Sequence, residues 1–217
     1  MSSKKPVKKQ PRKQVSSWVI FFISLAIIAA LIAVIKFTGN PKPIVPDQPT
    51  VFTPTHRAEI VLEDYGTIKL DLDGNAAPIT VANFAELSNS GFYDGLAFHR
   101  IIEGFMMQGG APKSGSPKPD TITGEFSANG HDNPLNHTRG AISMARAQDM
   151  NSGSSQFFIV HEDSPHLNGQ YAAFGYVVEG MEVVDAVCES AKPVDFNGSI
   201  APDNQPVIKT VTIREET

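Results

Sequence analysis

Cysteine, tryptophan and the common catalytic motifs are scarce in this chain of 217 residues. The single cysteine, Cys188, has no partner for a disulfide within the chain, so packing must stabilise the fold. No histidine can be assigned to activate its thiol, and we interpret it as a small buried residue of a helix. The motifs G-x-S-x-G, G-x-x-x-x-G-K, G-x-G-x-x-G and H-E-x-x-H are absent. Their absence argues against the commonest hydrolases, nucleotide-binding proteins and metalloproteases.

Acidic residues are missing from the first 17 positions, which contain six lysines and arginines. From residue 38 onward the balance reverses, with 11 Lys and Arg against 23 Asp and Glu. The formal charge of −5 therefore combines a basic tail with an acidic body. An acidic body argues against nucleic acid as a partner.

An uncharged run of 18 residues, WVIFFISLAIIAALIAVI at 18–35, follows the basic tail. Its length suits a helix that crosses the hydrocarbon core of a bilayer. Basic residues before such a helix favour a cytoplasmic N-terminus. We therefore predict a cytoplasmic tail at 1–17, a transmembrane anchor at 18–37, and an extracytoplasmic body, as in a single-pass protein of the cell membrane.

Two other interpretations of the uncharged run stay open. A cleaved signal peptide normally has an apolar region of roughly 7–15 residues followed by an A-x-A-like site. The run is longer than that, and the sequence KFTGN follows it. A buried helix of a soluble protein would leave the preceding basic residues unexplained.

Prolines are concentrated just after this run, at positions 41, 43, 46, 49 and 54. Proline favours extended chain and removes backbone donors, so we predict a semi-rigid linker at 38–56. A proline-rich docking motif is the alternative. The catalytic or binding body should then occupy residues 57–217.

The body contains many short segments with the alternation of half-buried strands. Residues 58–62 and 68–72 flank a turn at 64–66, which predicts an opening hairpin. Further strands are predicted at 97–102, 105–110, 141–146, 155–160, 172–178 and 207–213. Only two helices are indicated. The first has Asn75 as its cap and Pro78 in its first turn, and it ends at Gly91. The second is predicted at 180–189. The pattern predicts a mainly β fold, a closed antiparallel barrel whose ends the two helices cover.

The six histidines are scattered along the chain, and we expect no metal site. Candidates for a nucleophile or a general base are equally weak. Any reaction catalysed by this chain should therefore need none of them.

Three segments carry a specific resemblance. They are FHRIIEGFMMQGG at 98–110, SMARAQDMNSGSSQFFIV at 143–160 and HLNGQYAAFG at 166–175. Together they resemble the cyclophilins, and the resemblance extends over about residues 57–215. It implies an eight-stranded antiparallel barrel capped by two helices, with a proline-binding groove on its outer surface. It also implies peptidyl-prolyl cis/trans isomerase activity without a cofactor.

The resemblance assigns roles residue by residue. Arg100 of FHR corresponds to the catalytic arginine, and Phe158 of SQFF to the floor beneath the proline ring. The remaining substrate-binding residues that it implies are Phe105, Met106, Gln108, Ala145, Arg146, Gln156, Leu167, His166 and Tyr171. Two of these depart from the best-known eukaryotic members: His166 replaces a tryptophan and Tyr171 a histidine. The first change puts cyclosporin binding in doubt, and the segment around both residues resembles bacterial members.

From these features we expect an isomerase that accelerates X-Pro isomerisation in exported or envelope proteins, acting as a monomer on Pro-containing unfolded chains. Arg100 would donate a hydrogen bond to the prolyl nitrogen in the twisted transition state. One alternative is a binding module or chaperone that uses the same groove without catalysis. Another is a scaffold subunit whose groove is idle.

Overall fold

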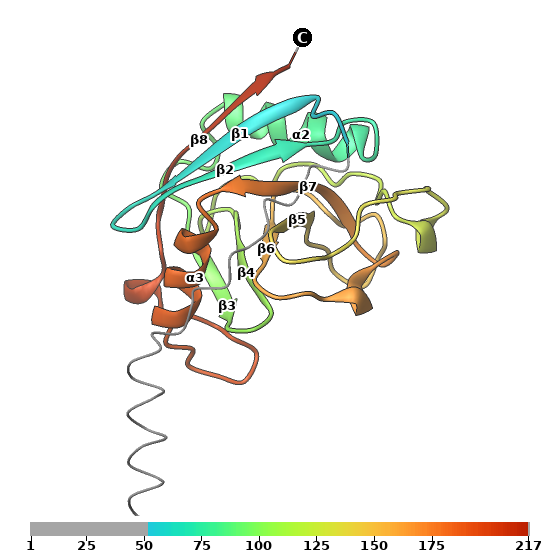
Figure 1. Cartoon of the computed structure of the whole chain (residues 1–217). Coiled ribbons are helices and arrows are strands. Elements are labelled where there is room, and N and C mark those ends of the chain that lie inside the picture. The colour runs from blue at the N-terminus through green and yellow to red at the C-terminus, as the bar shows by residue number, and fades with distance from the viewer. Residues whose placement is uncertain (1–51, 217) are drawn as a thin grey trace, which may run out of the picture. The chain divides into compact units, whose positions relative to one another are not determined.

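A computed structural model describes residues 52–216 of the chain (Figure 1). The predicted tail and transmembrane anchor, and most of the predicted linker, lie outside these residues. Within residues 52–216, no helix has the length and apolar character needed to cross a bilayer.

Eight strands form one antiparallel sheet in the order β3-β4-β6-β5-β7-β2-β1-β8. Each predicted strand is confirmed, with ends within two residues of those expected. The strands are β1 (His56–Leu62), β2 (Gly66–Leu72), β3 (Phe98–Ile102), β4 (Met106–Gly109), β5 (Ala141–Met144), β6 (Phe157–Val160), β7 (Ala172–Glu179) and β8 (Ile208–Glu215).

The sheet is curled, and its edge strands β3 and β8 approach each other (Figure 1). They do not pair as strands. An isolated bridge between Ala97 and Val207 joins the segments just before them, and the amide of Ile208 donates to the Leu96 carbonyl at 2.7 Å. The structure therefore shows a curled eight-stranded sheet, and the continuous ladder of the expected closed barrel is not formed.

The main core fills the inside of the curled sheet. Ile60 lies opposite Ile68 on one side and Val211 on the other, and all three side chains are buried. The alternation seen in the sequence thus marks the inward face of the strands correctly. Inward aromatic and aliphatic residues from the later strands complete this core, among them Phe98, Ile101, Phe157, Ile159 and Phe174.

The helices α2 (Pro78–Asn89) and α3 (Met181–Ser190) lie at opposite ends of the sheet (Figure 1). The first packs against β7 and β8, and the second against β2 and β4. In α3, Cys188 is buried among core residues, as predicted. Burial raises the pKa of its thiol to about 12, which keeps it protonated at neutral pH.

The start of α2 corrects one prediction. Pro78 occupies the first turn as expected, but Asn75 does not cap the helix. The carboxylate of Glu125 accepts hydrogen bonds from the amides of Ile79 at 2.9 Å and Thr80 at 2.8 Å. This cap comes from a residue more than 40 positions away, so the local sequence could not reveal it.

Candidate active site

A bulge in β3 decides where Arg100 points. The pairing of β3 with β4 shifts between Phe98 and Arg100, so two residues, His99 and Arg100, separate the fully buried Phe98 and Ile101. A bulge re-aims side chains in this way by adding one residue to a strand. Arg100 therefore lies on the outer face of the sheet, opposite Gln108 of β4.

The guanidinium of Arg100 is fixed at two of its three nitrogens. Its Nε donates to the carbonyl of Asn197 at 2.7 Å. Its Nη1 donates to Oε1 of Gln108 at 3.4 Å and lies 3.9 Å from the sulfur of Met106. Within residues 52–216, Nη2 has no hydrogen-bond partner. The arginine is thus oriented by the protein and retains a donor for a ligand.

A second apolar cluster lies on the outer face of the sheet, separate from the main core, and we call it the outer cluster. Strict alternation creates it: Met106 and Phe158 face outward, whereas Met107 and Phe157 face the core. Its members include six predicted site residues, all of which are buried in it or packed against it: Phe105, Met106, Ala145, Phe158, Leu167 and Tyr171. The structure therefore brings the predicted apolar residues together beside Arg100.

The polar residues of the predicted site form a short chain of hydrogen bonds. Gln108 accepts from Arg100, and its Nε2 donates to Oε1 of Gln156 at 3.0 Å. Both glutamines are partly exposed. Gln108 lies opposite Phe158 in the pairing of β4 with β6, and Gln156 immediately precedes β6, so both amides lie beside the outer cluster.

His166 and Tyr171, the two departures from the eukaryotic pattern, contact the apolar residues of the site. The ring of His166 packs against Phe105, with centroids 5.5 Å apart. The ring of Tyr171 meets Phe158 edge-on at 5.8 Å. Each replacement therefore remains in contact with an apolar side chain of the predicted pocket.

Arg146 is one of the predicted substrate-binding residues, and in the structure its side chain contacts neighbouring parts of the protein. The guanidinium stacks over Tyr171 at 4.8 Å and over Phe126 at 5.1 Å. Its Nε and Nη2 donate to the carbonyl of Gln170 at 3.0 and 2.9 Å. Such a guanidinium ties two loops together and holds the Tyr171 ring in place.

His137 packs beneath the Phe158 ring of the site, a position that was not predicted from the sequence. Its Nε2 lies 2.9 Å from the hydroxyl of Ser143, and its Nδ1 lies 3.1 Å from Oδ1 of Asn168. Its ring stacks on Phe158. Burial lowers the pKa of His137 to about 4, so the ring is neutral at pH 7. The long irregular segment that contains His137 has no periodicity that could have indicated its burial.

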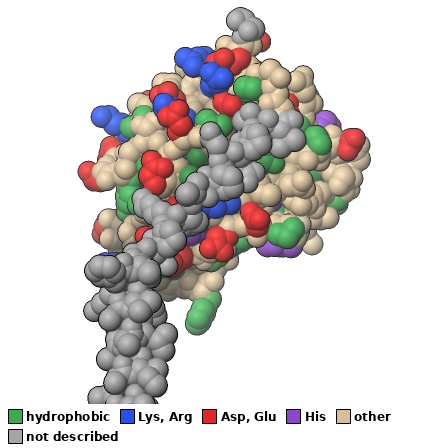
Figure 2. All heavy atoms as spheres, in the orientation of Figure 1, with side chains coloured by type: hydrophobic (Ala, Val, Ile, Leu, Met, Phe, Trp, Pro, Cys, Tyr) green, Lys and Arg blue, Asp and Glu red, His purple; other side chains and the backbone are tan. Residues whose placement is uncertain are grey.

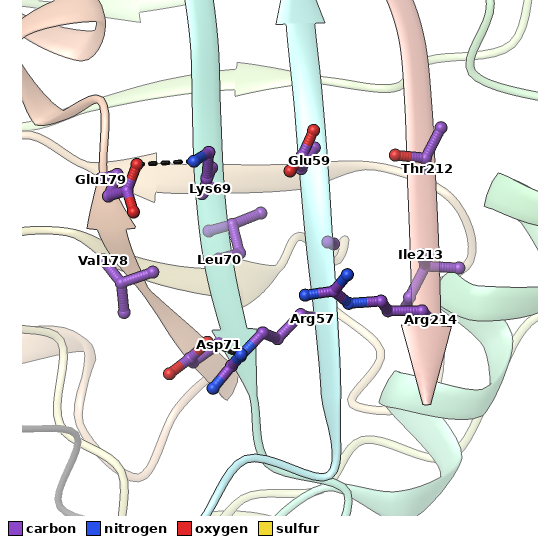
Figure 3. A pocket seen from close by; sticks show the side chains of 11 residues that line it. Arg57, Glu59, Lys69, Leu70, Asp71, Val178, Glu179, Thr212, Ile213 and Arg214 are labelled. Atoms are coloured by element: carbon purple, nitrogen blue, oxygen red, sulfur yellow. Dashed lines mark hydrogen bonds and ion pairs between the residues drawn. The ribbon is translucent and has the colours of Figure 1, made fainter. Parts of the chain in front are cut away.

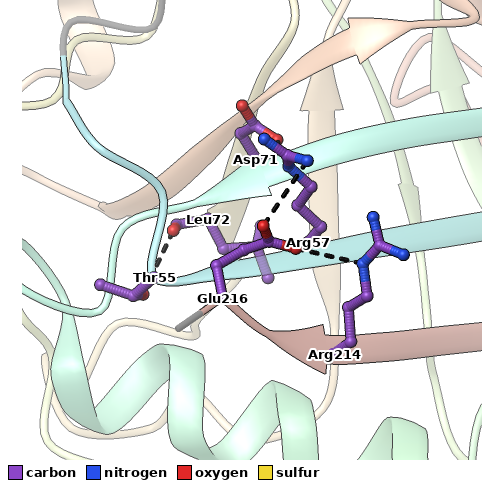
Figure 4. A network of polar contacts seen from close by, with 6 residues as sticks. All are labelled: Thr55, Arg57, Asp71, Leu72, Arg214 and Glu216. Carbon is purple, nitrogen blue, oxygen red and sulfur yellow. Dashed lines mark hydrogen bonds and ion pairs between the residues drawn. The ribbon is translucent and has the colours of Figure 1, made fainter.

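A hollow lies away from the candidate site, on the outer face of β8, β1, β2 and β7 (Figure 3). Two ion pairs lie within it, Lys69 with Glu179 at 2.7 Å and Arg57 with Asp71 at 3.2 Å. Glu216 extends this network and lies 3.6 Å from Arg57 (Figure 4). None of the predicted site residues lines this hollow.

Comparisons with known proteins agree on one family. The profile of the family described as "Cyclophilin type peptidyl-prolyl cis-trans isomerase/CLD" matches residues 57–215. Peptidyl-prolyl cis-trans isomerase B of Bacillus subtilis (strain 168) is 50% identical over 122 residues, covering 56% of this chain and 83% of the relative. Peptidyl-prolyl cis-trans isomerase A of Dickeya dadantii (strain 3937) is 40% identical over 172 residues, covering 77% and 86%.

A solved structure shows the same fold. It is a cyclophilin-type peptidyl-prolyl cis-trans isomerase of Cryptosporidium parvum, crystallised in the presence of the dipeptide Ala-Pro. It is 30% identical and superposes with a TM-score of 0.63, covering 74% of this chain and 99% of that chain.

Proposed function

The chain belongs to the cyclophilin-type peptidyl-prolyl cis-trans isomerases, and on this premise we propose that Arg100 and the outer cluster catalyse the isomerisation of X-Pro bonds. Family membership gives the reaction and the fold. The roles of individual residues follow from the geometry around Arg100.

The reaction breaks no covalent bond. Resonance in the imide sets a barrier of roughly 18–20 kcal/mol, and uncatalysed isomerisation takes about 10–100 s. At the top of the barrier the conjugation is lost, and the prolyl nitrogen becomes pyramidal with an available lone pair. A catalyst must therefore favour the twisted imide over both planar forms.

Arg100 meets this requirement through its fixed orientation. Its Nε and Nη1 are held by Asn197 and Gln108, which leaves Nη2 as a donor on the outer face. In the twisted imide the lone pair of the prolyl nitrogen can accept a hydrogen bond from Nη2. In the planar imide this lone pair is delocalised, so the same donor binds the twisted state more strongly. Lysine would serve less well because its ammonium lacks the planar fork that these contacts orient.

The outer cluster supplies the grip on the proline ring. Phe158 provides a flat apolar floor, and Met106 and Phe105 offer adaptable walls beside it. Because Phe158 is braced by His137 and Tyr171, its position does not depend on the substrate. The amides of Gln108 and Gln156 lie where they can hydrogen-bond the peptide backbone.

The single observation that carries this proposal is a guanidinium anchored at two nitrogens beside an apolar cluster that does not belong to the core. A protease-coupled peptide assay on the full-length protein tests it. Arg100→Ala should lower kcat/KM by about 100-fold or more. The matched control is Arg214→Ala, an arginine of β8 whose side chain is 71% exposed, and it should retain wild-type activity. Equal rates for Arg100→Ala and wild type would leave a Pro-peptide binding module as the better account.

We also propose that the enzyme acts outside the cytoplasm, on exported or envelope proteins. The basic tail, the uncharged run at 18–35 and the proline-rich stretch support this placement. The named relatives from Bacillus subtilis and Dickeya dadantii support a bacterial setting. On the face shown in Figure 2, acidic and basic side chains are both present, and the excess of Asp and Glu over Lys and Arg in the body argues against nucleic acid as a partner.

The placement has its own test. The intact N-terminus should be found in a washed membrane fraction, and protease added to spheroplasts, from which any outer barrier has been removed, should digest the body. Recovery of the full chain in the soluble fraction, or protection from external protease, would contradict it.

A further inference from the structure

The loop between α3 and β8 carries an unusual amount of exposed apolar surface. Four large hydrophobic side chains are exposed among residues 52–216, and two of them, Val194 and Phe196, lie in this loop. Val194 is 67% exposed, and Phe196, at 110%, has no contact that shields it from solvent. An isolated apolar side chain at a surface is ordinary. A fully exposed aromatic ring at a loop tip, however, would bury a large apolar area against a partner.

The tip of this loop is ordered by its own hydrogen bonds. The Oδ1 atom of Asp195 accepts from the amides of Asn197 and Ser199, both at 3.0 Å. The amide of Val194 donates to the carbonyl of Ser199 at 2.8 Å. The ring of Phe196 is therefore presented from a defined backbone and loses little order when a ligand covers it.

The loop is also joined to the strand that bears Arg100. The amide of Ile101 donates to the Gly198 carbonyl at 2.8 Å, and that of Ile200 to the His99 carbonyl at 2.9 Å. Figure 1 shows this segment running alongside the turn between β3 and β4. Gly198 has φ +85°, and a Cβ there would come within 2.7 Å of the Ile101 carbonyl oxygen, so only glycine permits this close approach.

The distance from the tip to the reacting centre is short. The Asn197 carbonyl lies 2.7 Å from Nε of Arg100, and Phe196 is the preceding residue. Backbone dimensions place its Cα within about 9 Å of the guanidinium, which an extended peptide spans in about three residues. A substrate whose proline sits on the outer cluster can therefore reach Phe196 with a side chain two to four residues from that proline.

We propose that Phe196, with Val194 beside it, is a specificity-determining contact that receives an apolar side chain of the polypeptide substrate near the isomerising proline. This inference rests on the proposed function, because it places the substrate at Arg100. The partner of Phe196 should be the substrate itself, because the backbone of the same loop binds the Arg100 guanidinium through the Asn197 carbonyl.

The test compares substrates that differ in one side chain. The probes are two series of proline-containing decapeptides with Leu or Gly placed two, three or four residues before or after the proline. Exchange spectroscopy by NMR gives kcat/KM for the full-length protein in nanodiscs. Wild type should prefer Leu over Gly in at least one position by about three- to tenfold, and Phe196→Ala should abolish that preference while leaving the Gly peptides unchanged.

Two further variants separate the possible failures. Ile79→Ala removes a side chain that is 44% exposed on α2, and it should keep the Leu preference. Arg100→Ala should slow both peptide series equally. If Arg100→Ala inactivates the enzyme but Phe196→Ala keeps the full Leu preference, this inference is wrong and the proposed function stands. If Phe196→Ala instead changes only retention on lipid vesicles, the loop contacts membrane and the inference is also wrong.

Discussion

The ring of His137 lies nearly parallel to that of Phe158, with an interplanar angle of 17° and centroids 5.9 Å apart. The proposed floor of the proline pocket is therefore the upper layer of a two-ring stack. The lower ring is neutral because it is buried, and its two nitrogens lie within hydrogen-bond distance of Ser143 and Asn168. Protonating His137 would place a charge under the pocket.

We expect stability to fall in acid because of His137. Its pKa is about 4 in the folded protein and 6.5 ordinarily, so the unfolded chain binds the proton more tightly. The stabilisation is complete above pH 6.5 and is lost as the pH falls toward 4, by about 3 kcal/mol. Denaturant titrations at pH 7 and pH 4.5 should show this slope in wild type and a shallower one in His137→Gln. An undiminished slope in the variant would show that His137 does not cause it.

Gln108 should matter for turnover more than for stability. It accepts from Nη1 of Arg100 and donates to Gln156, so Gln108→Leu frees one anchored nitrogen of the guanidinium. We expect kcat/KM to fall about tenfold, with a change in unfolding free energy within about 1 kcal/mol, because the residue is partly exposed. Peptide assays and denaturant titrations on the same preparations provide the comparison. A decrease in unfolding free energy well above 1 kcal/mol, accompanying the fall in kcat/KM, would mean that Gln108 acts through folding.

The Glu125 cap predicts a stability effect without a direct catalytic one. Its carboxylate is 1% exposed and accepts from two amides at the start of α2. Glu125→Ala leaves the buried amide of Thr80 and the partly buried amide of Ile79 without partners and should cost about 2–3 kcal/mol. Glu86→Ala, an exposed acid on the same helix, is the matched control and should change stability by less than about 0.5 kcal/mol. Equal melting temperatures for the two variants would show that the Glu125 carboxylate does not stabilise the start of α2.

Much of the fold could be predicted from the sequence because its strands alternate. The inward residues Ile60, Ile68 and Phe157 follow the two-residue period, and the same period sends Phe158 outward. Two features escaped this reasoning because they depend on distant contacts. The bulge at His99 is a property of the pairing between β3 and β4, and the edges of the sheet meet through loop residues and not through a strand ladder.

The candidate site was predictable only in part, for the same reason. The resemblance named Arg100 and the apolar residues, which the structure places together. The resemblance did not indicate the groups that hold these side chains in position. His137 lies in a segment without periodicity, and the carbonyl of Asn197 that holds Arg100 belongs to a loop almost 100 residues further along the chain.

The most direct test is the rate of isomerisation of a proline peptide while it is bound, measured by NMR exchange at saturating enzyme. We expect Arg100→Ala to slow this bound-state rate by about two to three decades. The affinity for the peptide, read from chemical-shift titration, should change less than about fivefold. An unchanged bound-state rate, or a loss of affinity large enough to explain the loss of activity, would contradict a role for the guanidinium in stabilising the twisted imide.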